Sequence, residues 1–276
     1  PGLFARHFTD AHLEWQPTTL DTPEEELPNY VSGSGDRLPF DDETFDAVVT
    51  IDTLEHIPPD ARSGFLKELT RVSRAAVIVA APFHHPSTAE VEKALDEAHR
   101  ELFNAPHPWL AEHVENGLPD LLKTIGVWPE GFAITSIQRS YDLEGWTAWQ
   151  AGWLARKLRG ELDTAWAQYE ESFAQAPVPE VASVPYRYLL LARRGAEKKE
   201  LLDANLPPPE AGREAVALAI FFHNMLRLLA TADGGSETSA VDQRLKEALS
   251  AAEKEILSLQ EPEHRPRGFM HRILKK

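Results

Sequence analysis

Two uninterrupted apolar runs, separated by a segment with helical spacing, constrain the fold of this chain more than any other feature. Residues 45–51 read FDAVVTI and residues 75–81 read AAVIVAA, without the polar alternation of a strand that has one wet face. Between them, Pro58 and Pro59 open a segment to Arg71 whose apolar residues fall on one helical face. The order strand, helix, strand predicts a βαβ unit in a parallel sheet whose strands are covered on both faces.

Further segments extend this pattern. We predict strands over 13–20, 29–34, 132–139 and 186–192, and helices over 3–8 and 145–173, with a mainly helical stretch over 87–124 that breaks at 105–108. After Gly195 no strand pattern returns, and helices are predicted over 197–206, 210–230 and 239–260. The sequence therefore predicts an α/β domain over residues 1–195 and a helical extension over residues 196–276.

The last predicted helix carries a short heptad pattern. Its apolar residues are spaced by 4, 3, 4 and 3 positions: Leu245, Leu249, Ala252, Ile256 and Leu259. About two heptads are short for a coiled coil, so two interpretations remain open. The helix forms a hairpin with the apolar face of residues 215–229, or it makes a homodimer or binds a protein partner.

Composition excludes several classes of partner. Lys and Arg number 28 against 44 Asp and Glu, a formal net charge of -16, which repels nucleic acid and anionic lipid. No cysteine is present, so disulfides and thiolate sites are excluded, as is usual in a reducing compartment. The most apolar stretch, 215–230, is interrupted by His223, Asn224 and Arg227, which argues against a membrane span. We expect a cytoplasmic protein.

A sequence motif carries a family resemblance. Residues 35–49 read GDRLPFDDETFDAVV and are followed at 54–57 by LEHI. This string resembles the class I S-adenosylmethionine-dependent methyltransferases, from the end of their third strand through the fourth. The resemblance extends over about residues 1–195, with AAVIVAAPF as the fifth strand and YRYLLLARR as the terminal one. It implies a Rossmann-like α/β fold and S-adenosylmethionine as the cofactor.

The resemblance also assigns cofactor contacts at the carboxyl ends of strands, where open α/β sheets bind ligands. The residues are Gly2, Asp21, Asp36, Arg37, Leu38, Ile51 and Asp52. Asp21 would bind the ribose diol and Asp36 the adenine amino group, with Ile51 and Asp52 under the methionine portion. Taken alone, Asp21 and Asp36 also fit ordinary turn or capping residues, and it is their order and spacing that favour the cofactor.

The start of the chain departs from the family pattern. The first strand and the acidic Gly-x-Gly loop of the family would precede Pro1, and only Pro1 and Gly2 resemble the end of that loop. In the family this strand lies at the centre of the sheet, so its loss exposes the neighbouring strands. We therefore expect that the chain from Pro1 to Lys276 is N-terminally incomplete, lacks the first strand, and binds S-adenosylmethionine poorly or not at all.

Two histidines are candidate catalytic residues. His56 follows the fourth strand of the resemblance, where an acceptor is expected, and a neutral imidazole can take a proton near pH 7. His84 follows the fifth strand and points by topology to the same rim. Local hydrogen bonding at the start of a helix is the alternative for His56. No helix shows the tight histidine and carboxylate spacing of a metal site, so no metal is predicted.

Aromatic residues suggest where the acceptor binds. Trp146, Trp149 and Trp153 share one helical face, which fits core packing or a lid that stacks on a flat acceptor. With Tyr141, the first two are the predicted substrate contacts.

A second motif, HPWLAEH followed by GLPD within residues 84–120, is similar to methyltransferase modules of surface-polysaccharide assembly. It implies O-methylation of a glycan or glycolipid precursor. Two other hypotheses remain: a small-molecule acceptor, and a non-catalytic scaffold whose helical tail binds a glycan-assembly partner.

Overall fold

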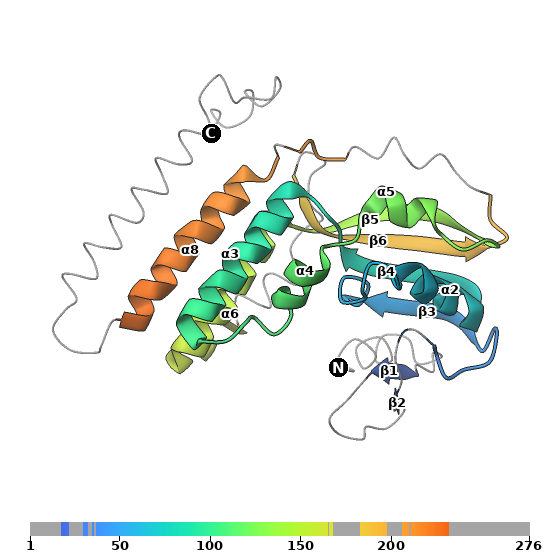
Figure 1. Cartoon of the computed structure of the whole chain (residues 1–276), viewed down its shortest axis with the longest axis horizontal. Coiled ribbons are helices and arrows are strands. Elements are labelled where there is room, and N and C mark those ends of the chain that lie inside the picture. Colours follow the sequence, from blue (N-terminus) through green and yellow to red (C-terminus); the bar gives the residue numbers. More distant parts are fainter. Residues whose placement is uncertain are drawn as a thin grey trace.

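A computed structural model of the chain describes residues 18–21, 30–32, 35, 37–164, 166–167, 183–197, 206–209 and 211–231. The strands are β1 (Thr19–Asp21), β2 (Tyr30–Ser32), β3 (Phe45–Ile51), β4 (Ser73–Pro82), β5 (Phe132–Asp142) and β6 (Pro185–Arg194). The helices are α2 (Arg62–Val72), α3 (Pro86–Phe103), α4 (Leu110–Asn116), α5 (Leu121–Gly126), α6 (Leu143–Leu158), the 3₁₀ turn η1 (Gly160–Leu162) and α8 (Arg213–Thr231). The fold is mixed α/β and Rossmann-like, as predicted (Figure 1).

Four strands form one mixed sheet in the order β3-β4-β6-β5, and β1 and β2 form a separate parallel pair. Strands β3 and β4 are parallel and joined through α2, which confirms the predicted βαβ unit. The prediction of a parallel sheet is wrong for β6, which runs antiparallel to β4 and β5. The reason is local, because β6 starts at the end of the sheet where β5 stops: the Leu143 N–H donates to the Val184 carbonyl at 2.9 Å.

Burial differs between the two apolar runs. In β4, Val77, Val79 and Ala81 are fully buried, as expected for a central strand. In β3 most residues are only partly buried, and Val49 is 39% exposed. The difference follows from position, since β3 pairs with β4 on one side and, among the described residues, with no strand on the other. Because Asp46 and Val49 are exposed, the expectation that residues 45–51 are covered on both faces is wrong for the described part of the chain.

The first hydrophobic core lies between the sheet and α2. Helix α2 contributes Phe65, Leu66, Leu69 and Val72, whose spacing places them on one face. The helix begins at Arg62, four residues later than predicted from Pro58, because residues 58–61 form a turn closed by a hydrogen bond from Ala61 N to the Pro58 carbonyl at 2.9 Å.

The second hydrophobic core lies among α3, α6 and α8, beyond the carboxyl end of β4 (Figure 1). Helix α6 is capped by Asp142 and ends at Leu158, because Arg159 takes an extended conformation and a 3₁₀ turn follows. The predicted continuous helix over 145–173 is therefore interrupted at residues 159–162, and residues 163–164 and 166–167 are helical again. The predicted break at 105–108 is confirmed between α3 and α4.

Helix α8, from the predicted extension, contributes Ala215, Ala219 and Leu226 to the second core. These residues belong to the apolar face of 215–229, on which the helix predicted over 239–260 was expected to pack. In the structure α8 packs against α3 and α6. The tail helix itself, over 239–260, lies outside the described residues, so the hairpin, the dimer and the domain boundary near Gly195 stay predictions. Within the described part of the chain, no helix combines the length and apolar character needed to cross a bilayer.

Candidate active site

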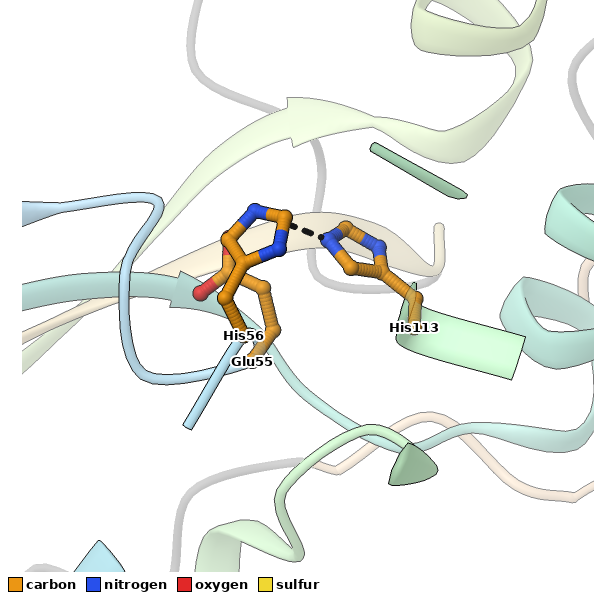
Figure 2. A group of neighbouring side chains, drawn as sticks. All are labelled: Glu55, His56 and His113. Carbon is orange, nitrogen blue, oxygen red and sulfur yellow. Dashed lines mark hydrogen bonds between the residues drawn. The ribbon is translucent and has the colours of Figure 1, made fainter. Parts of the chain in front are cut away.

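A tight turn after β3 builds the candidate site. Asp52 has a positive φ of 49°, and the His56 N–H donates to the Thr53 carbonyl at 3.0 Å, so the chain folds back directly beyond the strand. The turn buries Glu55, which is 1% exposed, and directs His56 towards α4. His113 reaches the same place from α4, which lies between the sheet and the helical bundle (Figures 1 and 2).

The two imidazoles face each other through their Nε2 atoms. The distance between His56 Nε2 and His113 Nε2 is 3.3 Å, and the ring centroids are 4.6 Å apart (Figure 2). On the other side of each ring, Nδ1 meets a carboxylate: His56 Nδ1 lies 2.7 Å from Glu112 Oε2, and His113 Nδ1 lies 3.0 Å from Glu92 Oε1. The two histidines thus form a pair held at both ends by carboxylates.

The inner carboxylate belongs to a buried network. Glu92 lies on α3 and is almost fully buried, and it accepts a second hydrogen bond from the Tyr186 hydroxyl at 3.0 Å. The Tyr186 ring stacks on Trp146 of α6, with 3.6 Å between centroids and 11° between planes. Burial, then the nearby negative charge of Glu92, raises the pKa of Tyr186, so its hydroxyl keeps its proton and donates. The network fixes His113 from the core side.

Two groups in the turn have pKa values shifted mainly by burial. Desolvation, with a smaller contribution from Asp52, raises the pKa of Glu55 to about 9. Its Oε2 atom is buried and has no hydrogen-bond partner among the residues that the structure describes. Desolvation and then His113 lower the pKa of His56, although Glu112 opposes this, so the imidazole is neutral at pH 7. One possible ligand atom from each of Glu55, His56 and His113 lies within 4.8 Å of the others.

A second polar pair flanks the cluster at the end of β3. Asp52 forms an ion pair with Arg187 of β6, and its side chain remains 41% exposed. Burial raises the pKa of Asp52 and Arg187 opposes that shift. Within the described part of the chain, the buried Arg187 Nε atom has no hydrogen-bond partner, and the guanidinium carbon lies 5.3 Å from the centre of the Tyr141 ring. Tyr141 has a positive φ of 56°.

The structure brings some of the predicted site residues together at this edge and places others elsewhere. Ile51, Asp52 and His56 lie at the carboxyl end of β3. His84 is exposed, and its N–H donates to the Pro119 carbonyl at 2.8 Å. His84 and Asp120 line a pocket of about 160 Å³. Neither His56 nor His113 is among the residues that line it.

The predicted adenosine contacts are less fully described. Arg37 is exposed, and Leu38 is buried in the first core while its N–H donates to Glu68 Oε2 at 2.9 Å. Asp21 ends β1, and its side chain, like Gly2 and Asp36, lies outside what the structure describes.

The predicted aromatic contacts lie away from the surface to different degrees. Trp146 is buried in the second core, which agrees with the packing interpretation. Trp149 is partly buried, with its ring centroid 5.5 Å from that of Trp166. Roles of Tyr141, Trp146 and Trp149 in substrate binding stay predictions.

Sequence reasoning missed half of the cluster. His113, Glu92, Glu112, Tyr186 and Arg187 come from α3, α4 and β6, and no spacing rule links them to the turn after β3. The available signal is the segment WLAEH, in which Glu112 and His113 are adjacent. It belongs to the motif HPWLAEH, which carries the similarity to modules of polysaccharide assembly.

Comparisons with known proteins agree with the motif over part of the chain. Residues 8–81 match a family model described as a methyltransferase domain. No curated protein matches the chain. Solved structures similar to it include the MccD protein, at 15% identity over 60% of this chain and 67% of that one, with a TM-score of 0.35. A putative methyltransferase from Bacillus halodurans has 16% identity over 61% of this chain and 71% of that one, with a TM-score of 0.31. A third similar structure is a complex between the Haloferax volcanii Trm112 methyltransferase activator and a putative methyltransferase. It has 12% identity over 72% of this chain and 79% of that one, with a TM-score of 0.38.

Proposed function

We propose that this protein is an S-adenosylmethionine-dependent methyltransferase whose acceptor binds at the carboxyl ends of β3 and β4. The observation that carries the proposal is the match of residues 8–81 to the methyltransferase domain, because the matched segment includes the strand and the turn that build the polar cluster. Ligands of open α/β sheets bind at this edge. The location is therefore consistent with the chemistry that the motif implies.

The described residues fit the amino-acid end of the cofactor. The Asp52 carboxylate, whose side chain is 41% exposed, is an acceptor for an ammonium group, and the guanidinium of its partner Arg187 is a donor for a carboxylate. Ile51 lies beside them at the end of β3. When bound, the cofactor supplies an electrophilic methyl group on a sulfonium.

The histidine pair suits an acceptor that loses a proton. A hydroxyl attacks a methyl group more readily when a base takes its proton, and a neutral imidazole is such a base near pH 7. His56 and its partner Glu112 are partly exposed, whereas His113 is buried. The basic atom of His56 is Nε2, because Nδ1 is bonded to Glu112, so the acceptor hydroxyl has to reach Nε2 beside His113 for His56 to take its proton.

A glycan or glycolipid precursor is the acceptor that we propose. Trp109 is 47% exposed and comes directly before α4, the helix that carries His113. Its ring packs against Trp153, with 5.5 Å between centroids, which holds an aromatic face at the surface. Sugar rings stack on such faces, so a glycan bound with one hydroxyl at the histidine pair has a platform for a neighbouring ring.

Cofactor binding is the first test. Calorimetry with S-adenosylhomocysteine is run on the chain from Pro1 to Lys276 and on a protein that includes any coding sequence found upstream of Pro1. Where either protein binds the ligand, we expect Asp52→Asn to weaken that binding, because Asp52 lies at the carboxyl end of β3. Arg74→Ala is the matched control, since Arg74 is exposed and pairs with Asp46 at the opposite end of β3. Absence of binding by both proteins favours the non-catalytic scaffold.

The acceptor is tested with the binding-competent protein and labelled methyl donor. Trp109→Ala is expected to raise the KM for an oligosaccharide acceptor and leave kcat nearly unchanged, because the side chain is remote from the reacting hydroxyl. Val127→Ala, at another exposed apolar residue, is the control. Methylation of small aromatic or quinone acceptors in preference to any glycan refutes the glycan proposal and supports the small-molecule alternative.

A further inference from the structure

We propose that His56, His113 and Glu55 form a binding site for one divalent transition-metal ion, with Zn²⁺ as the ion whose preferences they fit best. The metal ligands come from two separate segments, the turn after β3 and helix α4, so no spacing in the sequence indicates such a site. Three features of the structure support the inference: the protonation pattern of the imidazoles, the distance between them, and an unsatisfied buried carboxylate oxygen.

The flanking carboxylates fix which nitrogen of each ring carries the proton. A carboxylate oxygen only accepts hydrogen bonds, so Nδ1 of His56 donates to Glu112 and Nδ1 of His113 donates to Glu92. In two neutral imidazoles of this tautomer, both Nε2 atoms present lone pairs, and these face each other at 3.3 Å. Two opposed lone pairs repel unless a cation lies between them, and a proton or a metal ion meets that requirement.

The distance between the two nitrogens matches a metal site. Zn²⁺ binds imidazole nitrogen at about 2.0 to 2.1 Å with tetrahedral geometry, so two such ligands lie about 3.4 Å apart. The observed separation of 3.3 Å between the Nε2 atoms needs almost no rearrangement to receive the ion. Imidazole nitrogen also favours Zn²⁺, Co²⁺ and their neighbours over Mg²⁺, which prefers oxygen ligands.

Glu55 completes a three-ligand set. Its carboxyl group is buried next to His56, and no described residue forms a hydrogen bond with Oε2. Such a buried polar atom is costly unless a ligand satisfies it. One oxygen of Glu55 and one nitrogen of each histidine lie within 4.8 Å of one another, so the three side chains converge on one place. Two histidines and one carboxylate leave the fourth tetrahedral position for water or substrate.

The outer contacts are those of a metal site. Metal-binding histidines usually donate their second N–H to a carboxylate or carbonyl, which orients the ring. Both histidines do so here, and Glu92 is itself held by Tyr186. His56 is 24% exposed at its side chain, and Glu112 is 57% exposed, so an ion can enter from that side.

The consequence for catalysis rests on the proposed function, whereas ion binding itself does not. An ion at this place takes the Nε2 lone pair of His56, so in the metal-loaded protein His56 is a ligand and no longer a base. An acceptor hydroxyl at the fourth position would then be made acidic by the ion. Methyl transfer is therefore expected to be faster with Zn²⁺ or Co²⁺ than after chelation.

Ion binding is tested on the full chain after removal of metal with a chelator. Calorimetry with Zn²⁺ is expected to show one site per chain, and Co²⁺ is expected to give the visible absorption bands of tetrahedral nitrogen and oxygen coordination. The variants His56→Ala and His113→Ala should abolish this site, and Glu92→Gln should weaken it about 10- to 100-fold through the orientation of His113. Circular dichroism of each variant verifies that it is folded.

A matched control uses another histidine that meets a carboxylate. His223 on α8 lies 2.9 Å from Glu101, away from the cluster, and His223→Ala should leave Zn²⁺ and Co²⁺ binding unchanged. The inference is overturned if the wild-type chain binds neither ion, if binding persists in the His56→Ala, His113→Ala double variant, or if Mg²⁺ competes equally. Since these measurements need no cofactor, a failed methyltransferase assay and a failed metal site are recognised separately.

Discussion

Replacing Tyr186 with phenylalanine tests whether the buried network stabilises the protein. The Tyr186 hydroxyl donates to Glu92 Oε1 at 3.0 Å, and both side chains are almost fully buried. Tyr186→Phe removes one oxygen and leaves the ring stacked on Trp146, so no large cavity forms. Among the described residues, the side chain of Glu92 then keeps the hydrogen bond from His113 Nδ1 at 3.0 Å. The variant therefore isolates one hydrogen bond to a buried carboxylate.

The expected cost follows from the environment of that bond. A hydrogen bond to a charged group contributes about 1.5 to 3 kcal/mol, and a buried group that loses its partner also keeps its desolvation penalty. Because His113 still satisfies Oε1, we expect the free energy of unfolding to fall by about 2 kcal/mol, in the middle of this range.

Urea denaturation followed by tryptophan fluorescence measures this cost, since Trp146 lies 3.6 Å from the Tyr186 ring. Tyr188→Phe is the matched control on the same strand. Its ring is buried, yet no hydrogen bond of its hydroxyl is found among the described residues. We expect the control to change stability by less than about 0.5 kcal/mol. A loss of less than about 0.5 kcal/mol for Tyr186→Phe refutes the view that the network holds Glu92 and, through it, His113.

Three further predictions concern the frame around the site. Leu226→Ala removes a fully buried side chain of α8 from the second core, and we expect a loss of about 2 to 5 kcal/mol in urea denaturation, together with disruption of α3 and α6. Arg71→Lys should lower stability by about 1 to 2 kcal/mol in the same assay, because lysine cannot reproduce the paired hydrogen bonds to Glu68 or reach the two carbonyls of the preceding loop. Burial and then the nearby His99 lower the pKa of His107 from its usual value of about 6.5 to about 3. Between these two pH values the unfolded state therefore binds up to one more proton than the folded state. Stability should therefore fall by up to ~1.4 kcal/mol per pH unit as pH decreases from about 6.5 towards 3, and His107→Gln should flatten this slope in denaturation series at several pH values.

The sequence predicted the strands of the sheet because their apolar runs are long and local. FDAVVTI and AAVIVAA became β3 and β4, and the run at 186–192 became β6. The direction of β6 could not be predicted from its own residues. Its orientation depends on where the chain re-enters the sheet, and that is set by α6 and by the hydrogen bond between Leu143 and Val184.

Helix ends were predicted less well, because local geometry decides them. The two prolines before α2 predicted a start at Pro58, yet the first helical turn begins at Arg62. At the other end of the domain, Arg159 leaves the helical conformation before Gly160, although the apolar spacing continues beyond it. Hydrophobic periodicity indicates which face is buried and does not fix where the helix stops.

The candidate site shows the same division between local and long-range information. His56 and Asp52 were predicted because they follow a recognisable strand, and both lie at its carboxyl end. His113 is 57 residues from His56, and it meets that residue only because α4 is held between the sheet and the bundle.

Long-range packing also explains why a metal site was not predicted. Sequence patterns for metal sites depend on ligands that share one helix or one loop. Here His113 meets Glu55 and His56 only through the tertiary fold, and the outer carboxylates Glu92 and Glu112 come from two different helices. The second core therefore has a role beyond stability. By placing α3 and α4 against the end of β3, it brings a buried carboxylate and an imidazole to the one edge of the sheet where ligands of this fold class bind.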